Sequence, residues 1–432
     1  MSTAPAFKKT AVGEKEDVRA HPRGRLGTGV VDFVKFRWLV SPTASFTFAL
    51  SFVVAYFLWQ SFVPVNWNPV RPFLFLSYKI PDAEVLLWEA SKPIYGPVPT
   101  YSQGNFVLDH VRQACQGIHG YLFPHESPLL RYSKGVKDIP FIFFYILVFS
   151  FLRQVITQQV FKPLGARWGL RSEAKQTRFA EQGYALFYWG LAGTFGVYVM
   201  TFQDSWWYNL DHLWYQYPHW QMRPEVKLYY LLQFSYWLQQ ALVMFFRLER
   251  PRKDYYELVA HHIVTLWLVG WSYFINLTMI GTTVFVCMDI PDIFLALSKM
   301  LNYLDLNAFC MVIYGMFMCI WTYFRIYLSA RTLYSVWSDY HKIPAYARSF
   351  NPFGGFWLVY WMQCHVFAPL LLLLLLNLFW YALMWRILYR YVHCAAYLTC
   401  SAFFGIYGDT REEHEEGRSV ESKTKTLDNK AQ

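Results

Sequence analysis

Residues 258–299, "LVAHHIVTLWLVGWSYFINLTMIGTTVFVCMDIPDIFLALSK", consist of two apolar runs joined by a short polar turn at Asn276. Each run approaches the roughly 20 residues that an α-helix needs to cross the hydrocarbon core of a bilayer. We therefore predict a pair of antiparallel membrane helices over about 258–277 and 280–298. These runs also contain ionisable residues, which are costly inside a membrane and usually face a cavity or a partner.

The composition of the whole chain agrees with a membrane protein. Of 432 residues, 55% are hydrophobic and 21% are aromatic, which is too apolar and too aromatic for an ordinary soluble domain. The net charge of +10 comes from basic residues that flank the apolar runs. That placement is typical of membrane topology signals, so we expect no nucleic-acid partner.

Six further stretches have the length and composition of membrane spans. They lie at about 44–63, 139–160, 182–202, 227–246, 307–329 and 364–386. The sequence thus predicts an all-α fold, a polytopic transmembrane helical bundle of about eight spans. An even number of spans places both termini on the same side of the membrane.

The distribution of Lys and Arg predicts which side that is. The N-terminal arm, residues 1–43, is basic, as are the connections 161–178 and 247–257, whereas 201–220 contains neither Lys nor Arg. Because basic connections stay in the cytosol, we predict cytosolic termini. The connection 330–363 falls on the opposite side although it carries three basic residues.

The same reading divides the chain into four parts. The basic arm is followed by the first span and a luminal loop (44–138), a helical domain (139–390) and a cytosolic, largely disordered tail (391–432). The tail is polar and rich in charge, a composition that does not support a packed core.

Four ionisable residues stand inside the two spans of the opening stretch: His261, His262, Asp289 and Asp292. The aspartates are three positions apart, which puts both carboxylates on one face of a helix. Adjacent histidines diverge by about 100° around a helix, so only one of them points squarely into a given cavity.

The flanking charges indicate how deep these residues lie. His261 follows Lys253 by eight positions, and Asp292 precedes Lys299 by seven, or about 12 and 10 Å of helix. The two pairs therefore meet at a similar depth, nearer the cytosolic face. Pro291 loosens the helix between the aspartates and frees backbone carbonyls for a cavity.

Several functions are compatible with such a site. A metal is disfavoured because the chain lacks the HxxxH and HxxHH boxes of membrane diiron oxidases. A proton relay in a transporter, general acid–base or nucleophilic catalysis by a histidine, and a static polar cluster that locks the two helices together all remain open at this point.

The surrounding sequence resembles a known family. Residues 252–304, "RKDYYELVAHHIVTLWLVGWSYFINLTMIGTTVFVCMDIPDIFLALSKMLNYL", resemble the Lag motif of ceramide synthases. The flanking stretches 132–154 and 376–390 look like the TLC domain of the fungal longevity-assurance subfamily, and the resemblance spans about 60% of the chain. It implies that 139–390 is a TLC catalytic domain, in a multi-pass protein of the endoplasmic reticulum membrane.

The resemblance also implies an activity, N-acylation of a long-chain sphingoid base by a fatty acyl-CoA to give dihydroceramide or phytoceramide. The family's catalytic residues fall on His261, His262, Asp289 and Asp292. One histidine would act as a base or as a nucleophile that forms an acyl-imidazole. The aspartates would fix its tautomer and stabilise the imidazolium. No metal and no cofactor are expected, because acyl-CoA is a substrate.

Partners follow from the same resemblance. Besides acyl-CoA, the sphingoid base and membrane lipids, it implies a small single-span accessory subunit and a possible dimer. A group of basic residues at the expected cytosolic mouth is a candidate for binding the CoA phosphates: Arg247, Arg250, Arg252 and Lys253. The alternative is a non-enzymatic TLC-domain lipid chaperone, sensor or transporter.

Overall fold

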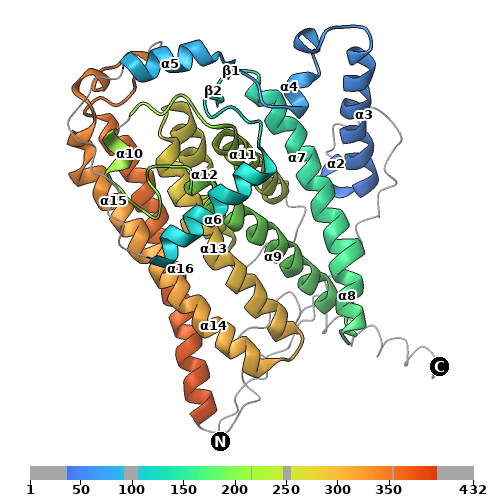
Figure 1. Ribbon diagram of the computed structural model, residues 1–432. Helices are drawn as coiled ribbons and strands as arrows, with labels where there is room; N and C mark the ends of the chain where they lie inside the picture. Colours follow the sequence, from blue (N-terminus) through green and yellow to red (C-terminus); the bar gives the residue numbers. More distant parts are fainter. Residues whose placement is uncertain (1–36, 92–105, 216, 247–253, 353–354, 397–432) are drawn as a thin grey trace, which may run out of the picture. The chain divides into compact units, whose positions relative to one another are not determined.

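The computed structural model describes residues 37–91, 106–215, 217–246, 254–352 and 355–396 (Figure 1). Within these residues, a helix occupies each of the eight stretches that the sequence predicted as spans, and the helical fold class is confirmed. These helices are α3 (Pro42–Gln60), α7 (Asp138–Val155), α9 (Glu173–Met200), α11 (Pro224–Phe245), α12 (Tyr255–Phe274), α13 (Thr278–Tyr303), α14 (Asn307–Trp321) and α16 (Met362–Ala396).

Two of these helices extend beyond the predicted stretches through π-helical segments. The segment η2 (Ile156–Phe161) continues α7 into α8 (Lys162–Arg167). The segment η3 (Thr322–Leu328) continues α14 into α15 (Ser329–Ser338). Short π-helical insertions are rare and often occur at functional sites, and η3 carries a residue of the site described below.

Five helices of the described chain are long and apolar enough to cross a membrane: Pro42–Gln60, Asp138–Arg167, Thr278–Tyr303, Asn307–Ser338 and Met362–Tyr389. Several expose large apolar side chains, including Phe57, Phe309 and Trp385. Such exposure suits lipid, which satisfies no polar group but accepts apolar ones. The protein is therefore a multi-pass membrane protein.

We call the described parts of residues 61–137, 201–223, 275–277 and 339–361 the loop layer. It contains the short elements η1 (Val65–Trp67), α4 (Arg71–Leu74), β1 (Lys79–Ile80), α5 (Asp82–Ser91), α6 (Phe106–Leu122), β2 (Arg131–Tyr132), α10 (His212–Tyr215), η4 (Tyr340–Lys342) and η5 (Ala345–Ala347). The strands β1 and β2 pair antiparallel, with Lys79 opposite Tyr132. Outside the layer, α2 (Arg37–Val40) precedes α3.

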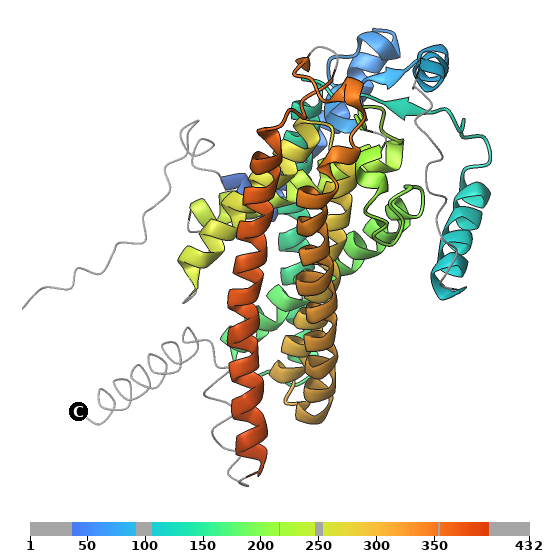
Figure 2. The same cartoon turned by 90° about the vertical axis from the view of Figure 1, so that its left-hand side faces the viewer.

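Hydrogen bonds between distant parts of the chain hold the loop layer together. The Tyr217 hydroxyl donates to the Ile275 carbonyl at 3.0 Å, and the Asn276 side-chain amide donates to the Gly355 carbonyl at 2.9 Å. Each of the eight long helical runs has one end at this layer, so successive runs alternate in direction (Figures 1 and 2). The alternation makes α12 and α13 the antiparallel pair that the sequence predicted.

A buried ion pair joins the loop layer to the helices. The Lys227 ammonium, fully buried in the first turn of α11, lies 2.7 Å from a carboxylate oxygen of Asp138 at the start of α7. It also donates to the carbonyls of Ser77 and Ser133 at 2.8 and 2.7 Å. The Tyr273 hydroxyl, on α12, donates to the other Asp138 oxygen at 2.8 Å. One charged centre thus connects three helices.

The packing of α9 against α13 depends on small residues. A Cβ atom at Gly196 would lie 2.4 Å from the Tyr229 hydroxyl and 2.8 Å from a Val286 methyl. Only glycine permits this approach of α9 to α11 and α13, as is typical of helix interfaces in membranes. The close approach brings all three helices around the middle of α13, where the aspartates lie.

Candidate active site

The two histidines lie on α12, in the half of the helix that is farther from the loop layer. His261 is 13 residues before Phe274, where α12 ends, and Asp292 is 14 residues after Thr278, where α13 begins. At 1.5 Å per residue both lie about 20 Å from the turn that joins the two helices. The prediction that the histidines and the aspartates share one depth is therefore consistent with the structure.

Aromatic rings from two other helices surround the imidazoles. The His261 ring centroid is 5.4 Å from that of Trp237 on α11 and 5.3 Å from that of Trp380 on α16. The His262 centroid is 5.5 Å from the same Trp237 ring. Both histidines are 8% exposed. The rings exclude water from the imidazoles and hold their planes.

The two imidazoles differ in their hydrogen bonds. Nδ1 of His262 lies 2.8 Å from the Leu258 carbonyl oxygen. A carbonyl only accepts, so Nδ1 of neutral His262 carries the proton and Nε2 keeps a lone pair. Within the described residues, the buried Nδ1 of His261 has no hydrogen-bond partner. His262 is thus held by its own helix, whereas no hydrogen bond from the described residues holds Nδ1 of His261.

Asp289 is fully buried and is held by α11. Its Oδ2 accepts hydrogen bonds from the Tyr229 hydroxyl at 3.2 Å and from the Gln233 amide at 2.5 Å. Gln233 in turn accepts from the Tyr188 hydroxyl of α9 at 2.9 Å. The other carboxylate oxygen, Oδ1, has no partner among the described residues, so one face of the carboxylate is fixed and the other is free.

Asp292 is paired with a residue that the sequence analysis missed. Arg325, on the π-helical segment η3, places Nη2 2.7 Å from Oδ2 of Asp292. The same nitrogen donates to the Met288 carbonyl at 2.6 Å, and the guanidinium lies 4.2 Å from the centre of the Trp321 ring. A signal was present, because an arginine inside the predicted span 307–329 carries the same burial cost as the aspartates.

The expected direct contact between histidine and aspartate is absent. Within the described residues neither His261 nor His262 hydrogen-bonds a carboxylate; Asp289 contacts Tyr229 and Gln233, and Asp292 contacts Arg325. The tautomer of His262 is set instead by the backbone of its own helix.

Some of the buried polar atoms that have no hydrogen-bond partner in the described chain belong to the helical segments that carry the site. They are His261 Nδ1, Thr265 Oγ1, Asp289 Oδ1, Arg325 Nε and Asn377 Oδ1. Asn377 reaches α13 through a 3.6 Å contact between its amide nitrogen and the Met288 sulfur. Such atoms are rare in native interiors, so these five are candidates for contacts with polar groups of a substrate.

An apolar cavity of about 40 Å³ lies between α12, α13 and α16, at the end of the bundle nearest the loop layer. Leu268, Phe285 and Leu370 are among the side chains that line it. On α12, His261, Thr265, Leu268 and Ser272 follow each other at spacings of four, three and four. They form one stripe along the helix, which runs from the imidazole to the cavity.

The basic residues proposed for CoA lie outside the described residues, because the structure describes nothing between 246 and 254. They connect the end of α11 at Phe245 to the start of α12 at Tyr255. Both of these helix ends lie away from the loop layer.

The fold and site define a polytopic membrane protein with the TLC domain. The TLC family model matches residues 178–386, a range that contains the histidines, both aspartates, Arg325 and Trp380. The site described above therefore lies wholly inside the matched domain.

Three curated proteins refine the assignment. The chain is 39% identical over 275 residues to sphingosine N-acyltransferase lac1 of Schizosaccharomyces pombe, covering 62% of this chain and 69% of that one. It is 36% identical over 296 residues to ceramide synthase LAG1 of Saccharomyces cerevisiae, covering 67% and 68%. It is 29% identical over 216 residues to ceramide synthase 4 of Bos taurus, covering 50% and 51%. The chain belongs to the sphingosine N-acyltransferase, or ceramide synthase, family.

Proposed function

We propose that this protein is a ceramide synthase that transfers a fatty acyl group from acyl-CoA to the amine of a long-chain sphingoid base. The product is a ceramide, dihydroceramide or phytoceramide. The observation that carries the proposal is the buried His261, whose Nδ1 has no hydrogen-bond partner among the described residues and which lies within the family's domain. Burying a polar group without a partner costs free energy, and a passive lipid chaperone does not need such a group.

His261 acts as the nucleophile. A ring nitrogen of the neutral imidazole attacks the thioester carbonyl, the carbon–sulfur bond breaks, and the proton of the other ring nitrogen neutralises the departing thiolate. An imidazole is nucleophilic at neutral pH without a stronger base. The surrounding Trp237 and Trp380 rings exclude water, which protects the acyl-imidazole from hydrolysis.

His262 acts as the base in the second half of the reaction. Its Nδ1–H is held by the Leu258 carbonyl, so its Nε2 lone pair accepts a proton from the ammonium of the sphingoid base. The free amine then attacks the acyl-imidazole, the amide bond forms, and the imidazole of His261 regains its proton. Neither half of the reaction requires a metal or another cofactor.

Asp289 and Asp292 stabilise the positive charges that arise in these steps. Asp289 keeps an unpartnered oxygen in the site, which suits it to receive the ammonium of the sphingoid base. Asp292 is held by Arg325, and this pair sets the field across the site without a direct bond to a histidine.

The bundle has eight spans with both termini in the cytosol, and the loop layer is luminal. Support comes from the alternating helix directions and from the basic connection 161–178 at the opposite end. Residues 139–390 form the catalytic domain.

CoA binds at the cytosolic mouth through Arg247, Arg250, Arg252 and Lys253, whose cations suit phosphate groups. The acyl chain follows the α12 stripe toward the apolar cavity.

The protein works in the endoplasmic reticulum membrane, with a small single-span accessory subunit and as a dimer. These assignments rest on the family resemblance. They suit a helix bundle that exposes large apolar side chains on α3, α14 and α16, since such faces can receive another membrane helix as readily as lipid.

The test is N-acylation by the full-length protein in microsomes, supplied with a sphingoid base and acyl-CoAs of several lengths. Wild type should form ceramide, and well-folded His261→Ala and Asp292→Asn variants should not. His341→Ala, at an exposed residue of η4, is the matched control and should keep activity. An inactive wild type, tested with a candidate accessory subunit present, would favour the lipid chaperone, sensor or transporter.

A further inference from the structure

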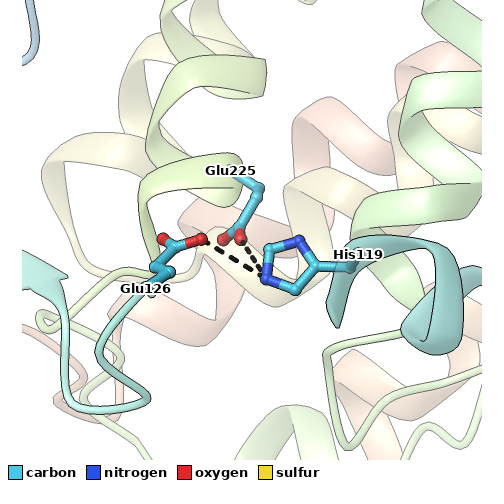
Figure 3. Close-up of side chains that lie close together, drawn as sticks. All are labelled: His119, Glu126 and Glu225. Atoms are coloured by element: carbon cyan, nitrogen blue, oxygen red, sulfur yellow. Dashed lines mark ion pairs between the residues drawn. The ribbon is translucent and has the colours of Figure 1, made fainter. Parts of the chain in front are cut away.

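A second cluster of ionisable residues lies in the loop layer, remote in sequence from the site described above. His119, near the end of α6, points its Nε2 between the carboxylates of Glu126 and Glu225 (Figure 3). Nε2 is 3.4 Å from Glu126 Oε2 and 3.7 Å from Glu225 Oε1. Within the described residues this is the one group of three or more such side chains whose ligand atoms lie together.

These distances match the edges of a metal coordination sphere. Ligand atoms that sit about 2.0–2.2 Å from one tetrahedral ion are about 3.4 Å apart from each other. In the described chain, neither contact of Nε2 with a carboxylate meets hydrogen-bond geometry; the hydrogen bond of this ring is made by Nδ1. The two carboxylates thus approach Nε2 closely without a hydrogen bond to it, and the three ligand atoms lie within 4.8 Å of one another.

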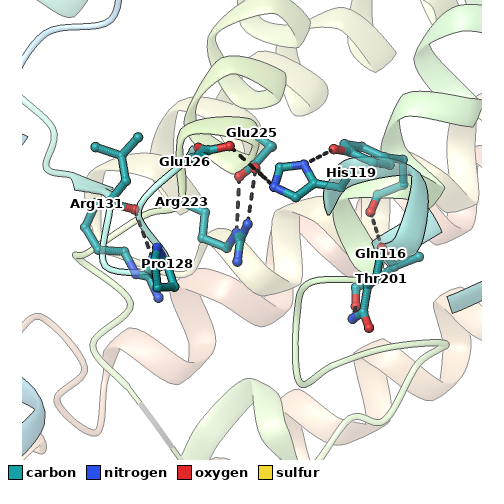
Figure 4. A network of polar contacts seen from close by, with 10 residues as sticks. Gln116, His119, Glu126, Pro128, Arg131, Thr201, Arg223 and Glu225 are labelled. Atoms are coloured by element: carbon teal, nitrogen blue, oxygen red, sulfur yellow. Dashed lines mark hydrogen bonds and ion pairs between the residues drawn. The ribbon is translucent and has the colours of Figure 1, made fainter. Parts of the chain in front are cut away.

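Outer contacts orient two of the ligands, as they do in metal sites. Nδ1 of His119 lies 2.7 Å from the Tyr198 hydroxyl. With Nδ1–H donating to that oxygen, Nε2 keeps the lone pair that a metal needs. Arg223 donates from Nε and Nη2 to the two oxygens of Glu225, each at 3.2 Å (Figure 4), and its guanidinium rests on the Phe202 ring.

The burial and the type of the three side chains also suit a bound cation. Arg223 pairs with one of the two carboxylates, Glu225, and Glu126 is the other carboxylate that faces Nε2 of His119. The side chains of His119, Glu126 and Glu225 are 13%, 19% and 12% exposed, so the site is shielded but a water molecule can complete the coordination. Two carboxylates and an imidazole are ligands that Zn²⁺ accepts in four-coordinate sites.

We propose that His119, Glu126 and Glu225 bind a structural Zn²⁺ ion that fastens α6 and the loop after it to the first turn of α11. The loop leads directly into β2, and α11 carries Lys227 of the buried ion pair two positions after Glu225. The ion therefore fixes the loop layer against the catalytic domain. This site is separate from the proposed acyl transfer and does not depend on it.

The test is metal binding by the purified full-length protein. After removal of metals with a chelator and dialysis against Zn²⁺ alone, elemental mass spectrometry should find one equivalent per chain in wild type. His119→Ala and Glu126→Gln should each lose it. His110→Ala is the matched control on the same helix, where the histidine is exposed, and should retain the full equivalent.

Thermal unfolding with and without Zn²⁺ separates a loss of metal binding from a folding defect, because each variant is compared with itself. Because a ligand that binds only the folded state stabilises it, Zn²⁺ should raise the melting temperature of wild type and of His110→Ala, and leave that of Glu126→Gln unchanged. Wild type that binds no Zn²⁺, or Glu126→Gln and His119→Ala variants that bind as much as wild type, would overturn the proposal. In the second case the metal is held adventitiously by other side chains.

Discussion

Arg325 and Asp292 form a buried ion pair, 2.7 Å between Nη2 and Oδ2, in the middle of the helix bundle. The arginine comes from a π-helical segment and the aspartate from a helix that contains Pro291. Pro291 has no N–H to donate within α13. Three residues before it, the Met288 carbonyl accepts a hydrogen bond from Nη2 of Arg325. Two local irregularities thus meet at one charge pair beside the histidines.

The first prediction concerns this pair. Arg325→Met leaves Asp292 without its counter-charge, and breaking a buried ion pair destabilises a protein by about 3–5 kcal/mol. We expect at least a tenfold loss of N-acylation, because Arg325 no longer offsets the charge of Asp292 in the site. Arg331→Met, at an exposed arginine of the same helical run, is the control and should keep both activity and stability.

The double variant Arg325→Met/Asp292→Asn separates the two effects. It contains no uncompensated charge, so thermal stability should return toward that of wild type while ceramide formation stays lost. Recovery of activity in the double variant would mean that Asp292 serves the fold alone.

The second prediction concerns the acyl intermediate. Incubation of the full-length protein with acyl-CoA, in the absence of a sphingoid base, should add the mass of one acyl group, and peptide mapping should place it on His261. His261→Ala should remain unmodified, and His341→Ala should be labelled like wild type. A fully active protein that never carries acyl mass would identify His261 as a base instead.

The helical framework was predictable because the length of an apolar stretch can be read directly from the local sequence. Each of the eight stretches identified in the sequence contains a helix, and the pair 258–277 and 280–298 agrees with α12 and α13 within a few residues at most ends. The extensions through η2 and η3 were not predictable, since a change of helical pitch depends on tertiary packing. The two-residue strands β1 and β2 were likewise beyond a local reading.

The active site was predictable only in part. His261, His262, Asp289 and Asp292 could be identified as ionisable residues inside spans, and Arg325 could have been found by the same criterion. Their partners could not be, because Tyr229, Gln233 and Trp380 are ordinary residues of apolar helices until packing brings them together.

The proposed zinc site had no sequence signal at all. Its ligands His119, Glu126 and Glu225 are seven and 99 positions apart, and no spacing rule connects them. Only the arrangement of α6 and α11 at the loop layer brings the three ligand atoms together.

The third prediction concerns the ion pair between Lys227 and Asp138. Lys227→Met keeps most of the apolar part of the side chain but leaves the Asp138 carboxylate buried without its counter-charge, so the free energy of unfolding should fall by about 3 kcal/mol or more. Lys162→Met is the control, because its partner Glu173 is 84% exposed and surface ion pairs contribute little to stability. Equal melting temperatures for the two variants would contradict the role assigned to the buried pair.

The fourth prediction concerns the glycine that permits α13 to approach α11. A Cβ atom at Gly281 would overlap the Tyr230 hydroxyl, which now lies 3.2 Å from the Ser272 hydroxyl of α12. Gly281→Ala must displace the Tyr230 ring, and overpacking of this kind costs about 1–3 kcal/mol. Gly315→Ala is the matched control, since no atom lies within 4 Å of its added Cβ and alanine favours a helix over glycine by about 1 kcal/mol. Thermal unfolding should therefore move in opposite directions for the two variants. A neutral Gly281→Ala would mean that α11 and α13 can separate without loss, and the cavity that Gly281 lines beside α16 would then be free to widen.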